Sequence, residues 1–195
     1  MDRTRRDPAK VGRLLRSLAR NVATESAITT VAADTGGADE AIERHTATEY
    51  IRCLERLMVV ENQPVWSPHL RSKSTVRKTP KRHFVDPSLA IAALRATPER
   101  LLEDMNLLGL LFESLVVRDL RIYAQACDGR VYHYRDNTGL EVDAIVETAG
   151  GRWAAFEVKL GDSRIDAGAA SLFKFGERVD TGECGSPEML GVITA

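Results

Sequence analysis

Three acidic residues and one lysine have the types and spacing needed for a divalent-metal site that cuts phosphodiester bonds. Glu113 lies within an apolar stretch, and Asp143 lies within a run of alternating polar and apolar residues. Glu157 and Lys159 belong to the segment Phe-Glu-Val-Lys-Leu. Acidic groups are costly to bury unless they meet a cation or a hydrogen-bond donor. The apolar flanks therefore indicate side chains that point inward at a common site, as in a nuclease-type domain.

The expected chemistry is attack of a metal-activated water molecule on a phosphodiester. Hard oxygen ligands suit Mg²⁺ or Mn²⁺, and we expect these from the carboxylates of Asp143 and Glu157 and the carbonyl of Val158. Glu113 is expected to bind a second ion or to orient a water molecule from the outer shell. Lys159 is expected to position the nucleophile or to stabilise the charge that gathers on the phosphate. The alternative is a solvated sheet on which Glu157 and Lys159 form a surface ion pair.

Periodicity predicts the elements that position these residues. Residues 107–126 form a strongly apolar helix that carries Glu113, and residues 131–134, 140–146 and 153–160 form three strands. A helix over 166–179 and a strand over 190–193 follow. Alternation along the second and third strands puts Asp143 on one face of its strand and puts Glu157 and Lys159 together on one face of theirs. The predicted order in this half is helix, three strands, helix, strand.

The first half has a different pattern. Apolar residues at helical spacing predict helices over 10–22, 27–32 and 46–58, the last opened by a capping box from Thr46 to Glu49. Short strands over 59–64 and 83–85 follow, and three helices followed by a hairpin is the order of a winged helix. We therefore expect a flexible basic N-terminus over 1–9, a winged-helix-like module over 10–87, connecting helices over 88–106 and the site-bearing domain over 107–195.

The loop between the two short strands is basic and contains no acidic residue. Lysine and arginine side chains along such a loop would displace counterions from nucleic-acid phosphates and bind without regard to sequence. The candidate phosphate-binding residues are Arg71, Lys73, Arg77, Lys78, Lys81 and Arg82. The alternative is a solvated loop on a helical module that packs against another domain.

Composition agrees with a soluble cytoplasmic protein. Residues 1–98 contain 17 Lys and Arg against 11 Asp and Glu, whereas residues 99–195 contain 10 against 17, so a basic half precedes an acidic half. Three cysteines without a CxxC motif indicate neither a disulfide framework nor a zinc site. No apolar run approaches the roughly 20 residues that span a bilayer. The chain ends on a predicted strand, which suggests a fragment of a longer protein.

Three segments carry a resemblance to known families. Leu111-Phe-Glu-Ser-Leu-Val-Val, the run from Tyr134 to Asp143, and Phe156-Glu-Val-Lys resemble the DUF4143 domain. The pattern also resembles the PD-(D/E)XK nuclease superfamily. The resemblance implies an α/β (α+β) fold: a winged-helix module followed by an αβββαβ nuclease-like domain with a mixed sheet. It further implies a parent AAA+ ATPase, whose ATP site would lie outside this chain because no Walker A loop is present.

Two main functions and one weaker one follow. The first is a metal-dependent DNA endonuclease, and the second is a catalytically inactive module that binds DNA or a protein partner. The third is a winged-helix regulator with an effector domain. DNA and the ATPase domain of the parent are the expected partners, a membrane is not expected, and a homo-oligomer is left open. His133 has no second histidine at ligand spacing, so we expect it to be packed or at a sheet edge.

Overall fold

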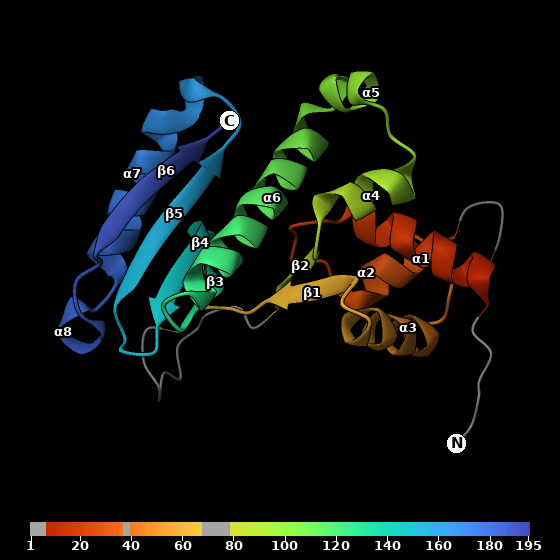
Figure 1. Cartoon of the computed structure of the whole chain (residues 1–195), viewed down its shortest axis with the longest axis horizontal. Helices are drawn as coiled ribbons and strands as arrows, with labels where there is room; N and C mark the ends of the chain where they lie inside the picture. The colour runs from red at the N-terminus through yellow and green to blue at the C-terminus, as the bar shows by residue number, and fades with distance from the viewer. Residues whose placement is uncertain (1–6, 37–39, 68–78) are drawn as a thin grey trace. The chain divides into compact units, whose positions relative to one another are not determined.

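The protein is a mixed α/β protein whose computed structural model describes residues 7–36, 40–67 and 79–195 (Figure 1). The chain divides into two compact units. The first comprises Met1–Asn62 and Arg82–Leu111, and the second comprises Gln63–Lys81 and Phe112–Ala195. The second unit therefore takes up a segment that precedes β2 in the chain. The contiguous domain boundaries expected from the sequence remain a prediction.

The first unit is built mainly from helices. These are α1 (Pro8–Arg20), α2 (Ile28–Ala33), α3 (Arg44–Arg56), α4 (Pro87–Leu94) and α5 (Pro98–Glu103). Strands β1 (Val60–Gln63, whose last residue belongs to the second unit) and β2 (Lys81–Phe84, whose first residue belongs to the second unit) form a two-stranded sheet. One hydrophobic core holds the helices together, and its fully buried members include Leu14, Ala47 and Ala90. Helical spacing of apolar residues explains this core, because it gives each helix one face that avoids water.

Two helices of this unit begin at an aspartate followed by a proline. The Asp7 carboxylate accepts a hydrogen bond from the Ala9 N–H at 2.9 Å, and the Asp86 carboxylate accepts one from the Ser88 N–H at 2.8 Å. Such caps satisfy backbone donors that have no partner within the helix. Helix α1 therefore begins at Pro8, inside the segment expected to be a flexible N-terminus.

The predicted capping box from Thr46 to Glu49 is wrong. Helix α3 begins at Arg44, so both residues lie inside the helix. Glu49 instead accepts a hydrogen bond from Arg52 at 3.0 Å, which is the i,i+3 spacing at which side chains meet on a helix surface. The capping pattern is present in the sequence, but the helix extends two residues further upstream.

The second unit contains a four-stranded mixed sheet and two long helices. Its elements are α6 (Met105–Gln125, beginning in the first unit), β3 (Gly129–Arg135), β4 (Glu141–Thr148), β5 (Trp153–Lys159), α7 (Ile165–Arg178) and β6 (Met189–Thr194). The strand order is β3-β4-β5-β6, with antiparallel pairing except between β5 and β6, which are parallel. The predicted order of helix, three strands, helix and strand is confirmed. Two short helices were not predicted, η1 (Asp162–Arg164) and α8 (Thr181–Cys184).

Aromatic residues fill one side of this unit. Trp66 is fully buried, and its ring centroid lies 4.9 Å from that of Trp153 and 5.9 Å from that of Phe175. Tyr134 also contacts Phe175, with ring centroids 4.9 Å apart. Aromatic pairs at these tilted and edge-on geometries are stabilising beyond the area they bury. Trp66, which precedes β2, is thereby held in the core of the second unit.

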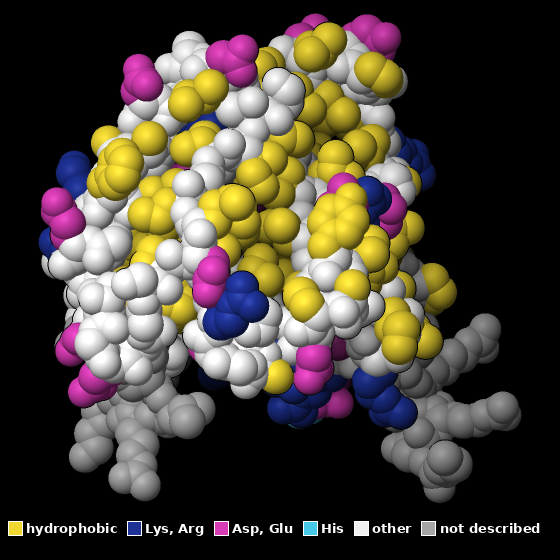
Figure 2. Space-filling model, turned by 60° about the vertical axis from the view of Figure 1, so that its left-hand side comes forward, with side chains coloured by type: hydrophobic (Ala, Val, Ile, Leu, Met, Phe, Trp, Pro, Cys, Tyr) yellow, Lys and Arg dark blue, Asp and Glu magenta, His cyan; other side chains and the backbone are white. Residues whose placement is uncertain are grey.

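The surface carries both apolar and charged side chains. Figure 2 shows hydrophobic side chains gathered on one face, with Lys, Arg, Asp and Glu side chains around them. Among the described residues of the second unit, the exposed large hydrophobic residues are Ile122, Tyr123, Ile165, Phe173 and Met189. Within the described ranges, none of the helices has the length and apolarity needed to cross a membrane.

Candidate functional site

The four residues that the sequence singled out all lie in the second unit. Glu113 comes from α6, Asp143 from β4, and Glu157 and Lys159 from β5. The three carboxylates are buried, with residue exposures of 9% for Glu113, 8% for Asp143 and 4% for Glu157. Because an unpaired buried carboxylate is strongly unfavourable, each must have a partner. Two lysines supply these partners and join the acids into one cluster, which we call the acidic cluster.

Asp143 sits where β4 and β5 cease to pair. The register between the two strands runs from Glu147 and Trp153 to Ala144 and Phe156. Beyond that point the Val158 N–H donates to Oδ2 of Asp143 at 2.9 Å, instead of to a backbone carbonyl of β4. The Asp143 carboxylate therefore takes the place of a ladder partner. This contact fixes the carboxylate beside the Glu157-Val158-Lys159 segment.

Lys159 links the two carboxylates of the neighbouring strands. Its Nζ lies 3.3 Å from Oδ2 of Asp143 and also pairs with Oε2 of Glu157. The other oxygen of Glu157 accepts a hydrogen bond from the Ser171 hydroxyl of α7 at 3.1 Å. The alternation along β5 predicted that Glu157 and Lys159 share a face, and the two side chains are paired there. They do not form a surface pair on a solvated sheet, because Glu157 is buried.

Lys81 is the second lysine of the acidic cluster. Its Nζ lies 2.6 Å from Oε1 of Glu113 and 3.5 Å from Oδ1 of Asp143. Lys81 was expected in an exposed phosphate-binding loop, and that placement is wrong, because it opens β2 and is 6% exposed. A signal for such a donor was present, since Glu113 on an apolar stripe required a facing cation or hydrogen-bond donor. Nothing in the spacing identified which residue it would be.

Arg82 was also expected in the exposed phosphate-binding loop, and this placement is wrong too. Arg82 lies in β2 and is 9% exposed, and its guanidinium donates to the Ser26 carbonyl at 2.5 Å. Its backbone N–H donates to the Thr24 carbonyl at 3.2 Å. The guanidinium bond uses the side chain to stabilise the first unit, so the side chain does not face solvent phosphates. The other candidate phosphate-binding residues, Arg71, Lys73, Arg77 and Lys78, lie outside the described residues.

Gln63 is a second residue of the site that the sequence did not indicate. Its side chain is fully buried, and its amide Nε2 donates to the Tyr132 and Asp143 carbonyls, both at 2.9 Å. The β3–β4 register shifts between Tyr132 and Tyr134, so a bulge lies at this point. A bulge leaves ladder groups unpaired. The Gln63 amide bridges the backbones of the two strands at the bulge and holds the backbone of Asp143.

The segment after Gln63 continues along β3. The His133 N–H donates to the Pro64 carbonyl at 3.0 Å, and the Trp66 N–H donates to the His133 carbonyl at 2.7 Å. Val65 and His133 form a parallel bridge. His133 is fully buried, in agreement with its expected packing role. Burial, together with the charge of Lys81, lowers the pKa of His133 to about 4, so the imidazole is neutral at pH 7.

The three carboxylates of the acidic cluster differ in the direction of their pKa shifts. Burial raises the pKa of Glu113 to about 7, although Lys81 opposes the shift, and burial together with the Asp143 charge raises the pKa of Glu157 to about 7. Burial would also raise the pKa of Asp143, but the charges of Lys81 and Lys159 outweigh it and the pKa is lowered. Asp143 is therefore the carboxylate that stays ionised at neutral pH.

Burial acts on the two lysines in the opposite direction, because it disfavours their charged form and so lowers the pKa. Burial alone would lower the pKa of Lys81, but the carboxylates of Glu113 and Asp143 outweigh it, so the pKa is raised. For Lys159 burial is likewise outweighed, by Asp143 and Glu157, and its pKa is also raised. Both ammonium groups are therefore charged at pH 7. Three carboxylates and two ammonium groups, all fully ionised, would leave one uncompensated negative charge.

The donors that fit a divalent cation are Asp143 and Glu157. They lie on adjacent strands and share Lys159, and Mg²⁺ is commonly bound through one or two carboxylates together with substrate phosphates. Glu113 does not extend this set, because Lys81 holds its carboxylate. Over residues 7–36, 40–67 and 79–195, no three His, Cys, Asp or Glu side chains are grouped closely enough to hold an ion. The arrangement therefore offers a two-carboxylate site with Lys81 beside it.

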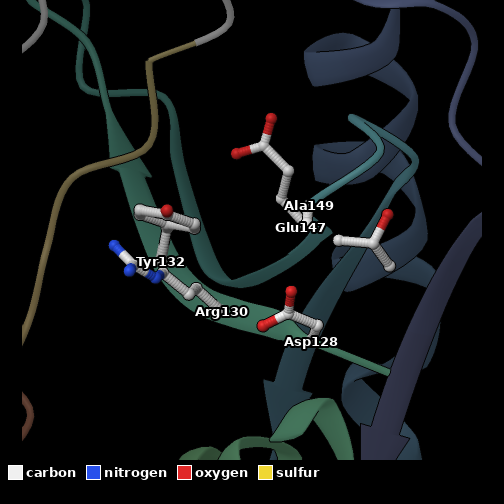
Figure 3. A pocket seen from close by; sticks show the side chains of 6 residues that line it. Asp128, Arg130, Tyr132, Glu147 and Ala149 are labelled. Carbon is white, nitrogen blue, oxygen red and sulfur yellow. The ribbon is translucent and has the colours of Figure 1, made fainter. Parts of the chain in front are cut away.

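A separate open cavity of about 280 Å³ lies elsewhere in the second unit (Figure 3). It is lined by Asp128, Arg130, Tyr132, Glu147, Thr148 and Ala149. Figure 3 shows the Arg130 guanidinium directed away from the Asp128 carboxylate. The Glu147 carboxylate accepts a hydrogen bond from Trp66 Nε1 at 3.2 Å. The polar groups that line this cavity do not converge on one point, so the acidic cluster is the stronger candidate site.

Comparison with known families gives two matches. The model described as Domain of unknown function (DUF8612) matches residues 2–100. The model described as Domain of unknown function (DUF4143) matches residues 108–186, the part that contains Glu113, Asp143, Glu157 and Lys159. The resemblance to DUF4143 inferred from the sequence is therefore confirmed. No curated protein and no solved structure is a significant match to the chain.

Proposed function

The chain belongs to the family described as DUF8612 and carries a DUF4143 domain, and we propose that this domain is a PD-(D/E)XK nuclease-like module that hydrolyses phosphodiester bonds in DNA. The observation that carries the proposal is the meeting of Asp143 with Glu157 and Lys159 where β4 and β5 stop pairing. The element order of a helix, three strands, a helix and a parallel strand supports the same fold assignment.

Each residue has a role that follows from its contacts. Asp143 stays ionised and, with Glu157, supplies oxygen ligands for Mg²⁺ or Mn²⁺. A bound divalent cation supplies Lewis-acid stabilisation of charge on the phosphoryl oxygens. Lys159 lies between the two carboxylates and would place its ammonium group beside the phosphate. The Ser171 hydroxyl orients Glu157 through its hydrogen bond.

The proposal also assigns a role to the first unit and names the partners of the protein. The first unit would act as a winged-helix-like module, because three helices precede its two-stranded sheet. ATP would enter only through a AAA+ ATPase domain outside this chain. In this proposal DNA is the substrate, and the ATPase domain is the protein partner.

The test is cleavage of supercoiled plasmid and of branched duplex DNA in Mg²⁺ or Mn²⁺. Asp143→Asn and Lys159→Met are each expected to lower cleavage at least about a hundredfold, since they remove a ligand charge and a charge-stabilising group. Lys174→Met, which changes an exposed lysine on α7, is the matched control and should cleave like the wild type. Cleavage that persists in both site variants would exclude this site.

A second candidate function is a binding module without catalysis. The Lys81 ion pairs favour it, because the protein's own ammonium group already pairs with both Glu113 and Asp143. This function predicts DNA binding that weakens steeply with salt and no cleavage in either metal. Affinity that does not change with salt concentration would contradict it for DNA.

A further inference from the structure

Lys81 places an ammonium group beside two buried carboxylates of the acidic cluster. Its ammonium group lies 2.6 Å from Oε1 of Glu113 and 3.5 Å from Oδ1 of Asp143, and the residue is 6% exposed. A buried ammonium gives up its hydration, and only well-placed carboxylates compensate for that loss. The two carboxylates therefore stabilise the buried ammonium of Lys81, and the ammonium stabilises the two buried carboxylates.

The net charge of the acidic cluster depends on which cation lies beside Glu113 and Asp143. With Lys81 present, three carboxylates and two ammonium groups leave one negative charge when all are ionised. With a divalent cation in place of the Lys81 ammonium, three carboxylates, Lys159 and the ion would be neutral. A divalent cation bound near Asp143 while Lys81 remains would instead face a like charge at short range. Lys159 lies at the other oxygen of Asp143, 3.3 Å from Oδ2, so the Lys81 ammonium and the divalent cation are alternatives at Oδ1.

We propose that the Lys81 ammonium is a built-in competitor of the divalent cation, so that the acidic cluster binds metal tightly only when Lys81 leaves Glu113 and Asp143. This inference rests on the proposed function, since it concerns the same metal ligands. It assigns Lys81 to the control of the site, and departure of the ammonium frees the Glu113 carboxylate from its ion pair.

The test is titration of the whole chain with Mn²⁺. Binding is measured by calorimetry and by the electron paramagnetic resonance signal of free Mn²⁺. Lys81→Met is expected to bind Mn²⁺ at least about tenfold more tightly than the wild type, because it removes a positive charge a few ångströms from the ion. Lys174→Met should match the wild type. Adding Glu113→Gln to Lys81→Met should reverse part of the gain. Equal affinity in the wild type and Lys81→Met, or no binding by either, would overturn the inference.

Folding of the variant is part of the same test. If Lys81→Met folds only when Mn²⁺ is added, the ion has replaced the ammonium and the inference is supported. If the variant stays unfolded with and without Mn²⁺, the cluster accepts no cation but Lys81, and the inference is overturned. In the wild type, the Nζ resonance of Lys81 should shift as Mg²⁺ binds. An unchanged resonance once Mg²⁺ has bound would count against competition.

The inference and the proposed function can fail separately. A wild-type chain that does not cleave DNA, together with tighter Mn²⁺ binding by Lys81→Met, would overturn the nuclease proposal and leave the competition standing. Metal-dependent cleavage that Asp143→Asn abolishes, together with Mn²⁺ affinity that Lys81→Met leaves unchanged, would do the reverse.

Discussion

The ammonium group of Lys81 lies 2.6 Å from Oε1 of Glu113, and both side chains are almost completely excluded from solvent. The two residues are 32 positions apart in the chain. Lys81 opens β2, and Glu113 belongs to α6. This ion pair gives the buried acid on the apolar helix the partner that its environment requires, without a metal ion.

Removing the Lys81 charge should destabilise the metal-free protein. Lys81→Met leaves Glu113 and Asp143 buried without their shared cation, and breaking a buried pair in this way costs about 3 to 5 kcal/mol. Urea unfolding in EDTA would measure the loss, and Lys174→Met should change stability by less than about 0.5 kcal/mol. The double variant Lys81→Met with Glu113→Leu should recover much of it, because apolar residues can replace a buried pair. A double variant no more stable than Lys81→Met would contradict this account.

Gln63 should matter more than its position in a short strand suggests. Gln63→Ala removes both hydrogen bonds at the bulge and leaves the Tyr132 and Asp143 carbonyls buried without that donor. The expected loss is about 2 to 4 kcal/mol, from two bonds and the packing of the side chain. Gln125→Ala, at the exposed end of α6, is the matched control. Equal unfolding midpoints for the two variants would show that the bridge contributes nothing.

Acid should destabilise the protein partly through His133. The pKa of this imidazole is lowered to about 4, below its ordinary value of 6.5, so the unfolded chain binds the proton more tightly than the folded chain. Stability from this group is therefore complete above about pH 6.5 and is lost as the pH falls toward 4, by about 3 kcal/mol. Glu113 and Glu157 oppose the trend between about pH 4.5 and 7, because their raised pKa values favour the folded state in acid.

The contribution of His133 can be isolated by comparison with His133→Gln. The unfolding free energy of the wild type should fall more than that of the variant between pH 7 and pH 4, because the variant has no imidazole to protonate. The gap, wild type minus variant, should therefore decrease. A gap that is constant across this range would contradict the lowered pKa. Measurement of the imidazole proton resonances against pH gives an independent check.

Two glycines of α7 should respond differently to the same substitution. A Cβ on Gly168 would lie 3.2 Å from both methyl groups of Val192 and 3.5 Å from Cβ of Glu157, whereas a Cβ on Gly176 would meet only Leu190, at 3.6 Å. Alanine favours a helix over glycine, so Gly176→Ala should stabilise by about 0.5 kcal/mol. Gly168→Ala should be less stable than Gly176→Ala by about 1 kcal/mol or more, since it presses α7 away from the sheet.

Thermal unfolding of the two glycine variants side by side measures this difference. If Gly168→Ala gained as much stability as Gly176→Ala, the close approach of α7 to β5 and β6 would not constrain the helix. A Gly168→Ala variant in which the Ser171 to Glu157 hydrogen bond is also lengthened would connect this packing to the acidic cluster.

Local pattern was enough to predict most elements of the second unit. The apolar run around Glu113 predicted α6, and alternation predicted β4 and β5 with Asp143 and Glu157 on them. Both signals are short-range, because they depend only on which neighbouring side chains avoid water. The capping box at Thr46 failed for the complementary reason, since a cap motif inside a longer apolar period cannot decide where the helix begins.

The sequence by itself determined the members of the acidic cluster that lie on α6, β4 and β5, and it determined that Glu113 needs a cation or a hydrogen-bond donor facing it. Only the tertiary structure decided that this partner is Lys81, and that Gln63 bridges the bulge beside Asp143. The physical reason is that both residues reach the site through a segment that leaves one compact unit and joins the other. No hydrophobic period or spacing records such a long-range contact, because its stability comes from burial and charge pairing between distant parts of the chain.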